Sequence, residues 1–306
     1  MNGDMVIDRP IFIVGCGRSG TTLLFDLLAQ HPDVARTTGY PDGEDHAGWI
    51  RYGHCAMAGI GNVHSGQYGN GINGSNYCLH LTSADATPEI VRSMREYCWE
   101  SVLGRNACKR LLNKQPHLSN KLGYVLGLFP DARIIQIVRD CRPVVASWIA
   151  VMAQHPSLTA YWPQEQYPCF WLFQRLTSST AASALNRHER FFPGGGSDLW
   201  VDYWLKVNLG IEEQMPDSMD QLCVVRYEDL TEAPQRVLEA LCQFCELDRH
   251  EFCVDGIQRG TEKRHVAYLT ESLWSQIDTR TIGARRYFGY LRGFPWTRRH
   301  PRLLAN

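Results

Sequence analysis

Short apolar runs alternate along this chain with segments of helical periodicity. The first run, residues 11–14, reads Ile-Phe-Ile-Val, and its β-branched and aromatic residues are typical of a strand that is buried on both faces. Similar runs cover residues 133–138 and 222–225, and a helical pattern follows each of them. This alternation predicts an α/β fold, with an open, mostly parallel sheet of about five strands and helices on both faces.

The spacing of apolar residues predicts helices over residues 21–28, 88–103, 120–129, 199–214 and 234–246. Residues 35–45 are expected to form a loop that ends in acidic residues, and residues 222–230 a strand that leads into a turn. Residues 48–80 are dense in Gly, Asn and His and show no sustained period. We therefore predict a single domain over residues 1–306, with substrate-side insertions at about 46–88 and 150–205.

The glycine-rich turn after the first strand predicts an anion-binding site. Glycine allows the backbone to approach a ligand, and the N-terminus of the following helix supplies N–H groups and a positive dipole. The turn fits the nucleotide-triphosphate pattern G-x-x-x-x-G-K-[ST] at Gly15, Gly20 and Thr22. Thr21 stands where that pattern needs lysine, and Arg18 is the cation of the turn. The residues of the turn therefore disfavour ATP or GTP hydrolysis, but they still favour an anion-binding site. The alternative is that the turn is a strand-turn-helix corner that binds no ligand.

Composition narrows the class of protein. The chain has 306 residues, of which 44% are hydrophobic, and a formal net charge of −1, which gives no electrostatic footprint for nucleic acid. It has no run of about 18 apolar residues, which predicts no membrane span. Residues 1–5 lack the basic and apolar regions of a signal peptide, and 11 scattered cysteines are typical of buried thiols. We expect a soluble cytoplasmic protein with neither nucleic acid nor membrane as partner.

Four residues near the end of the chain could suggest zinc: Cys242, Cys245, His250 and Cys253. Cys242 and Cys245 share the apolar face of the helix predicted over residues 234–246. This placement favours thiols in the hydrophobic core over metal ligands. We therefore predict no metal site.

The G-R-S-G-T-T run at residues 17–22 resembles the 5′-phosphosulfate loop of sulfotransferases that use 3′-phosphoadenosine 5′-phosphosulfate (PAPS), which commonly reads P-[RK]-S-G-T-T. The arginine form, followed by Leu-Leu and His-Pro-Asp, is most similar to the bacterial and tyrosylprotein branches. Three further segments resemble the family in the same order: a K-x-P turn at Lys114, a run from Arg139 to Ser147, and V-V-R-Y-E-D-L-x-x-x-P around Tyr227. The resemblance implies a P-loop-like fold.

The resemblance also implies how the donor is held. Arg18 and the loop backbone would hold the 5′-phosphosulfate, Arg139 and Ser147 the 3′-phosphate, and Tyr227 the adenine. Strand geometry supports the second pair, because the strand end delivers Arg139 to the ligand crevice and Ser147 lies about two turns into the next helix. A late basic segment closes over the 3′-phosphate in the family, which suggests Arg285 or Arg286 here. The complete set of expected donor-binding residues is Arg18, Ser19, Gly20, Thr21, Thr22, Arg139, Ser147, Tyr227, Arg285 and Arg286.

Sulfuryl transfer, like phosphoryl transfer, requires alignment of the reactants and neutralisation of charge on the moving group. The resemblance gives these roles to Arg18 and Lys114, so no metal is required. The acceptor must also lose a proton to a base. Glu44 occupies the place of the catalytic glutamate in this branch, and its neighbours Asp45 and His46 stay open as alternatives.

The sequence therefore predicts a PAPS-dependent sulfotransferase with a carboxylate base. The sulfuryl group would pass in line to a hydroxyl, in preference to an amine, of a small-molecule metabolite, leaving adenosine 3′,5′-bisphosphate (PAP). The alternatives are a P-loop nucleotide kinase or phosphotransferase and a non-catalytic nucleotide-binding protein. The acceptor, the regiochemistry and the oligomeric state, a homodimer included, stay open at this stage.

Overall fold

A computed structural model describes residues 6–39, 43–53, 76–78, 81–104, 109–154, 175–177, 198–215, 219–258 and 269–291. Its centre is a five-stranded sheet in the order β2-β4-β1-β5-β7, and all neighbouring strands are parallel. The strands are β1 Ile11–Val14, β2 Val34–Arg36, β4 Arg110–Lys114, β5 Arg133–Val138 and β7 Leu222–Arg226. The predicted α/β class and the parallel five-stranded sheet are confirmed.

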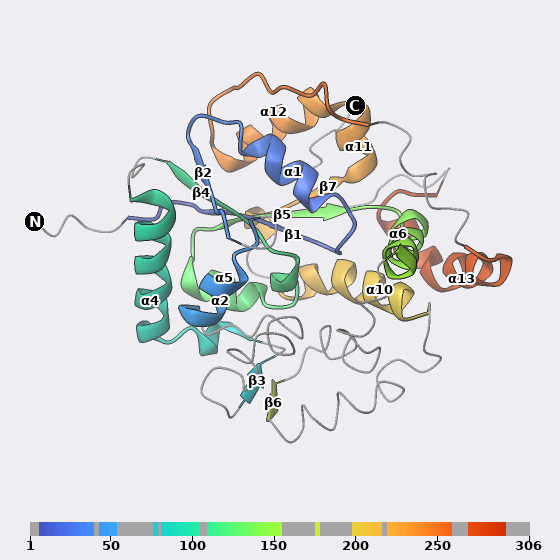
Figure 1. Cartoon of the computed structure of the whole chain (residues 1–306), viewed down its shortest axis with the longest axis horizontal. Coiled ribbons are helices and arrows are strands. Elements are labelled where there is room, and N and C mark those ends of the chain that lie inside the picture. The colour runs from blue at the N-terminus through green and yellow to red at the C-terminus, as the bar shows by residue number, and fades with distance from the viewer. Residues whose placement is uncertain are drawn as a thin grey trace, which may run out of the picture.

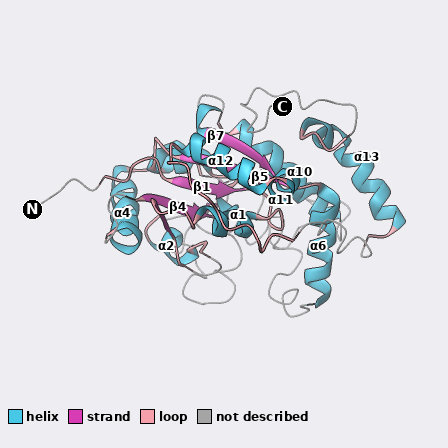
Figure 2. Cartoon of the chain, turned by 90° about the horizontal axis from the view of Figure 1, so that it is seen from above, coloured by secondary structure: helices cyan, strands magenta, loops and turns pink. Residues whose placement is uncertain are grey.

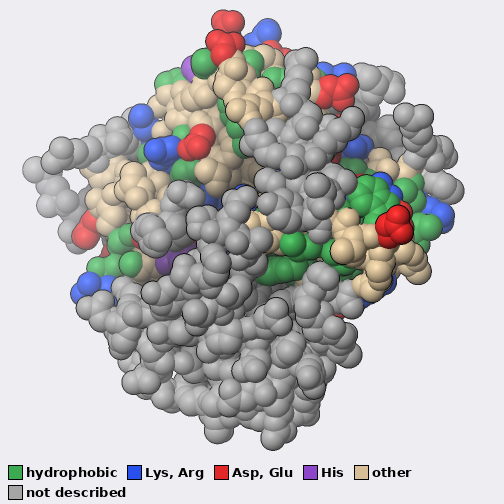
Figure 3. Space-filling view, turned by 45° about the vertical axis from the view of Figure 1, so that its right-hand side comes forward, with side chains coloured by type: hydrophobic (Ala, Val, Ile, Leu, Met, Phe, Trp, Pro, Cys, Tyr) green, Lys and Arg blue, Asp and Glu red, His purple; other side chains and the backbone are tan. Residues whose placement is uncertain are grey.

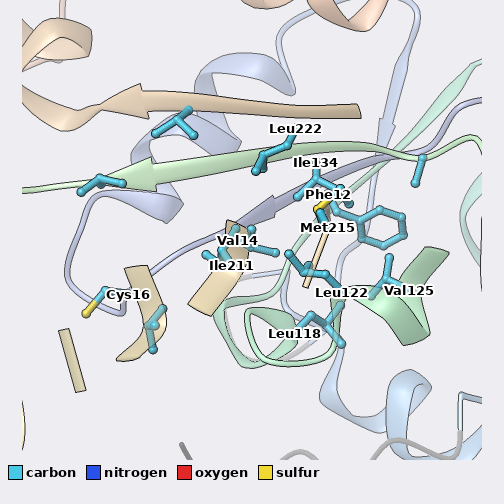
Figure 4. Packing of buried hydrophobic residues seen from close by; sticks show 14 of the residues in the cluster. Phe12, Val14, Cys16, Leu118, Leu122, Val125, Ile134, Ile211, Met215 and Leu222 are labelled. Atoms are coloured by element: carbon cyan, nitrogen blue, oxygen red, sulfur yellow. The ribbon is translucent and has the colours of Figure 1, made fainter. Parts of the chain in front are cut away.

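The sheet is buried on both faces, as the composition of its strands predicts. Successive side chains of a strand point to opposite faces. Phe12 and Val14 therefore pack in one hydrophobic cluster, and Ile11 and Ile13 pack in the other. Figure 4 shows Phe12 and Val14 among apolar residues of neighbouring strands and helices. The strand that leads into the glycine-rich turn is thus fixed on both sides.

Helices cover the two faces as separate layers (Figure 1). On one face lie α1 Thr21–Leu28, α11 Tyr227–Glu232 and α12 Pro234–Cys245. The other face is covered by α4 Pro88–Cys98, α5 Leu122–Leu128, α6 Cys141–Gln154, α10 Asp198–Glu213 and α13 Glu271–Tyr287. Figure 2 shows α4 near one end of the sheet and α6 and α13 near the other.

The remaining elements are short. They are α2 His46–Arg51, η2 Ser83–Asp85, the π-helical turn η3 Trp99–Leu103, η4 Pro116–Leu118, η6 Met219–Gln221, and an antiparallel pair formed by β3 Asn76–Cys78 and β6 Arg175–Thr177. Most of the two predicted insertions, including the run of three glycines at 194–196, lies outside the described residues.

Three local predictions were wrong. The loop predicted over residues 35–45 was wrong at its start, because residues 35 and 36 belong to strand β2. This strand is stabilised by pairing with β4, and its three residues show no alternation of their own. The segment after β7 forms helix α11 instead of a turn. Helix α2 covers residues 46–51 and so extends into the region 48–80, where the lack of a sustained period predicts irregular structure. All three elements are short and depend on tertiary contacts.

The strand order places the glycine-rich turn at a topological switch point. The chain continues from β1 to β2 and β4 on one side, and later to β5 and β7 on the other. Ligands of open α/β sheets bind in the crevice at the carboxyl ends of the strands where the order reverses. Lys114 ends β4 opposite Ile13 of β1, and Arg139 directly follows β5. The segments singled out by sequence therefore end at one edge of the sheet.

The described surface carries both signs of charge. On the face in Figure 3, basic and acidic side chains are interspersed among the residues that are coloured by type. Within the described ranges, no helix combines the length and the apolar character that crossing a bilayer requires. Cys242 and Cys245 are buried in the hydrophobic cluster beneath α12, which confirms them as core thiols.

Candidate active site

The turn between β1 and α1 is shaped by close backbone contacts. Gly15 has φ of +136°, and a Cβ there would lie 2.4 Å from the carbonyl oxygen of Ile137, so only glycine fits. Two hydroxyls from distant parts of the chain hold the turn. The Gly15 N–H donates to Ser119 Oγ at 3.0 Å, and the Gly17 N–H donates to the Tyr203 hydroxyl at 2.5 Å. The loop is therefore positioned by η4 and α10 as well as by its own strand.

Helix α1 begins without a side-chain cap. Its N-cap residue, Gly20, is left-handed with φ of +95°, and the first turn contains no acidic residue. The N–H groups of a first helical turn lack partners within the helix, and they carry the positive end of the dipole. This end of α1 is therefore suited to an anion, as the sequence predicts.

Arg18, Arg139 and Ser147 come together although they belong to different segments. Arg18 Nε donates to Ser147 Oγ at 3.1 Å, and Arg139 Nη1 donates to the carbonyl oxygen of Arg18 at 3.3 Å. Arg139 is 9% exposed, and its buried Nε has no hydrogen-bond partner among the described residues. A buried cationic donor is costly when it is unpaired, so this position is suited to an anion.

Tyr227 packs against both parts of this arrangement. The guanidinium carbon of Arg139 lies 4.2 Å from the centroid of the Tyr227 ring, in a cation–π contact. The same ring fills the space beside Gly20, where an added Cβ would lie 2.4 Å from Tyr227 Cδ2. Tyr227 is therefore a packing partner of the loop and of Arg139 at the same time.

A second cluster, centred on Glu44, lies at the end of β4. Lys114 Nζ donates to Glu44 Oε1 at 2.7 Å, and His46 Nε2 lies 3.0 Å from Glu44 Oε2. The Gln115 side chain donates to the backbone carbonyl of Glu44 at 2.6 Å. The Lys114 and Glu44 side chains are 1% and 13% exposed, so the ion pair is largely removed from water.

Asp45 points away from this cluster. It is the N-cap of α2, where its carboxylate accepts from the Gly48 N–H at 3.2 Å and from the Tyr97 hydroxyl at 2.5 Å. Burial raises the pKa of Asp45, and the hydrogen bond from Tyr97 opposes that rise. Of the three neighbouring candidates for the base, Glu44 contacts Lys114 and His46, whereas Asp45 caps a helix.

The model of the sulfotransferase family matches residues 10–251, which include both clusters. This chain belongs to the sulfotransferase family. The matched region extends from the residue before the first strand to six residues beyond α12, and it contains Arg18, Glu44, Lys114, Arg139 and Tyr227.

Several curated relatives of this sulfotransferase are similar over part of their length. It is 33% identical to a Drosophila melanogaster protein-tyrosine sulfotransferase over 143 residues, which are 46% of this chain and 25% of that one. It is 31% identical to human protein-tyrosine sulfotransferase 1 over 47% of this chain and 35% of that one. It is 26% identical to the Mycobacterium bovis omega-hydroxy-beta-dihydromenaquinone-9 sulfotransferase Stf3, over 91% of this chain and 73% of that one.

Solved sulfotransferase structures are similar at low identity. A sulfotransferase from Alicyclobacillus acidocaldarius shares 15% identity with a TM-score of 0.48, covering 91% of this chain and 96% of that one. Mouse sulfotransferase SULT7A1 complexed with PAP shares 13% identity with a TM-score of 0.46, covering 91% and 85%.

The late basic residues of this sulfotransferase differ in their surroundings. Arg285 is 3% exposed and pairs with Asp140 at 3.1 Å and with Asp278 at 2.8 Å. Asp278 also accepts from Arg142 Nε at 3.0 Å, so these pairs tie α13 to the start of α6. Arg286 is exposed on the same helix. The contacts of Arg285 favour a role in holding the segment after Arg139, and a phosphate contact for either arginine stays a prediction.

His117 is a neighbour of the Glu44 cluster that sequence reasoning missed. Its Nε2 lies 3.9 Å from Glu44 Oε2, and its ring centroid lies 5.0 Å from that of His46. Burial, with the nearby charges of His46, Lys121 and Lys114, lowers the pKa of His117 well below its ordinary value. The sequence feature that could have identified His117 is its position directly after the K-x-P turn. Pro116 begins η4 there, and the short helix brings residue 117 back toward Lys114.

Proposed function

We propose that this protein transfers the sulfuryl group of PAPS to a hydroxyl of a small molecule, with Glu44 as the base. One observation carries the proposal. A carboxylate and an ammonium group, Glu44 and Lys114, form an ion pair of 2.7 Å at the carboxyl edge of β4, which pairs with the strand that enters the anion loop. Proton removal and charge neutralisation are the two tasks that sulfuryl transfer assigns to the protein.

The residues present fit a donor with phosphate groups at both ends of its ribose. The uncapped N-terminus of α1 and the glycine turn suit one anion. Arg139, whose Nε has no hydrogen-bond partner in the described part of the chain, and Ser147 suit a second anion. The carbonyl of Arg18 accepts from Arg139 and so connects the two places. When bound, PAPS would supply the sulfuryl group and a stable leaving group, PAP.

The ion pair also suggests how proton transfer and charge stabilisation are coupled. The acceptor oxygen forms a bond to sulfur while the bond between sulfur and the bridging phosphate oxygen breaks, and Glu44 takes the proton of the acceptor hydroxyl. As Glu44 becomes neutral, the Lys114 ammonium loses its counter-charge. Its charge then stabilises the oxygen of the departing phosphate, where negative charge develops.

One comparison supports a small-molecule hydroxyl as the acceptor. The match to Stf3, whose name describes an omega-hydroxy menaquinone as substrate, covers 91% of this chain, whereas the match to the Drosophila tyrosine-directed relative covers 46%.

The test is incubation of the protein with PAPS and a fractionated metabolite extract, followed by mass spectrometry for SO₃ mass gains. We expect new sulfated species with the wild-type protein and none with Glu44→Gln, which keeps the size of the side chain. A parallel incubation with Mg-ATP addresses the kinase alternative, since phosphorylated products there, without sulfated ones, would replace the proposal. Tight PAP binding without any sulfated product would instead indicate a non-catalytic nucleotide-binding protein.

A further inference from the structure

Three side chains with metal-binding atoms meet in the Glu44 cluster, and one of them is the proposed base itself. A carboxylate oxygen of Glu44 and ring nitrogens of His46 and His117 all lie within 4.8 Å of one another. They come from two segments about 70 residues apart, so the fold rather than a local motif brings them together. We propose that these residues form a Zn²⁺ site and that bound zinc inhibits the transferase. The inhibition rests on the proposed role of Glu44, whereas the metal binding does not.

The spacing of the ligand atoms suits tetrahedral zinc. Bonds of about 2.0–2.1 Å in a tetrahedron place neighbouring ligand atoms about 3.3 Å apart. Glu44 Oε2 lies 3.0 Å from His46 Nε2 and 3.9 Å from His117 Nε2. The ring nitrogens of the two histidines lie within 4.8 Å of each other, so shifts of about 1 Å in the side chains would complete the geometry. Two imidazoles and one carboxylate are the ligand set of zinc sites that keep a fourth position open, whereas calcium and magnesium prefer oxygen alone.

The surroundings of Glu44 restrict how the metal can bind. Lys114 Nζ holds Glu44 Oε1 at 2.7 Å, which leaves Oε2 as the oxygen turned to the histidines. A hydrogen bond to the second oxygen orients a ligating carboxylate. Gln115 fixes the same residue through the backbone carbonyl of Glu44. The charge of Lys114 also weakens the attraction for a cation, so we expect binding that a chelator reverses.

Zinc on this site would remove the base without displacing it. With Zn²⁺ on Oε2 and the Lys114 ammonium on Oε1, both carboxylate oxygens of Glu44 are engaged by cations. A carboxylate in that state cannot accept the proton of an acceptor hydroxyl. The residues proposed to bind the donor, such as Arg18 and Arg139, include none of the three zinc ligands. PAP should therefore bind equally well with and without zinc.

The first experiment measures metal binding on the full chain after chelator dialysis, by titration calorimetry with Zn²⁺ and by the visible absorption of Co²⁺. We expect one strong site in the wild-type protein and an affinity lower by about tenfold or more in His117→Gln. The matched control is His250→Gln, because His250 packs against His31 with ring centroids 5.3 Å apart, away from the proposed ligands. PAP binding and thermal unfolding establish that each variant is folded.

The second experiment measures sulfuryl transfer with increasing Zn²⁺, each variant compared with its own metal-free rate. We expect zinc to abolish turnover in the wild-type protein and in His250→Gln, and a chelator to restore it. In His117→Gln the same zinc concentrations should inhibit much less. Equal zinc affinity in wild type and a folded His117→Gln would overturn the site. Zinc binding that leaves the rate unchanged, or raises it, would overturn the inhibition alone. If the protein transferred no sulfuryl group, the proposed function would fall, and the binding experiment would still decide the site.

Discussion

The donor side and the base side that we propose for this member of the sulfotransferase family are built in different ways. The residues proposed for the donor side stand in the turn after a strand, as Arg18 and Arg139 do, or in the first turns of the next helix, as Ser147 does. On the proposed base side, Glu44 lies between elements, and its partners come from β4, α2 and η4. A repeated strand-to-helix geometry thus positions the proposed donor residues, whereas tertiary packing assembles the residues around the proposed base.

The two sides also differ in charge balance. On the base side, positive and negative groups already neutralise one another, because Lys114 and Glu44 are paired. On the donor side, Arg139 is buried over an aromatic ring, and its Nε has no partner among the residues that the structure describes. A substitution on the base side should therefore act on turnover, and one on the donor side on nucleotide affinity.

The largest expected effect is that of Glu44→Gln. Loss of the base should lower turnover about 10²- to 10⁴-fold. PAP affinity should stay unchanged, because glutamine can still accept from Lys114 and contact His46. Steady-state rates and calorimetric PAP titrations check both parts. Near-normal turnover in Glu44→Gln, together with loss of turnover in His46→Gln, would move the role of base to His46.

Lys114→Met should have the next largest effect. Removing a cation that stabilises the transition state should reduce kcat about 10²- to 10³-fold, with a smaller change in PAP affinity. Lys121→Met is the matched control, because Lys121 is also a buried lysine but donates to Asn120 Oδ1 and the carbonyl of His117. If the two variants lost kcat equally after normalisation for folded protein, Lys114 would have only a structural role.

Arg139→Met should act on affinity. Loss of a charged hydrogen bond to the 3′-phosphate should weaken PAP binding about 10- to 100-fold. Adenosine 5′-phosphosulfate, which lacks the 3′-phosphate, should bind the variant and the wild type with the same affinity. Equal losses for the two ligands would reject the 3′-phosphate assignment and leave Arg139 as a support for Tyr227.

The smallest effect is on stability, at the donor side. Glu228 accepts from the Asp140 N–H at 3.1 Å and from the Tyr290 hydroxyl at 3.0 Å, and its burial raises the pKa of its carboxyl. An acid with a raised folded-state pKa stabilises the fold at low pH, and that contribution is lost as pH rises through this pKa.

Glu228→Gln should therefore raise the Tm by a few degrees at neutral pH, and the gain should shrink toward pH 4. Thermal unfolding between about pH 4 and 8 measures this trend. Glu239→Gln, at the surface-exposed pair with Arg249, serves as the control with little pH dependence. A Tm of Glu228→Gln below that of the wild type at every pH would contradict this prediction. It would show that losing the carboxylate hydrogen bonds costs more stability than removing the buried charge restores.

Sequence could name the residues proposed for the donor side because each stands beside a local signal. The apolar run of β1, the glycine turn and the position of Arg139 after β5 are all readable within short windows. Strand β2 was missed because its three residues gain their stability from pairing with β4. A strand of that length has no periodicity of its own to detect.

The base side could be predicted only in part. Glu44, Asp45 and His46 are adjacent, and sequence alone does not say which way each side chain points. The hydroxyl of Tyr97, 52 residues away, draws Asp45 into the helix cap. His117 joins the cluster only when η4 lies beside residues 43–46, a contact that follows from the packed sheet.

The ring of Tyr227 links the two ends of the proposed nucleotide site. It fills the space that a side chain at Gly20 would need, and it also contacts the guanidinium group of Arg139. A bulkier residue at Gly20 would displace this ring and disturb its contact with Arg139, so a change in the turn after β1 would be felt at the residue proposed to hold the 3′-phosphate.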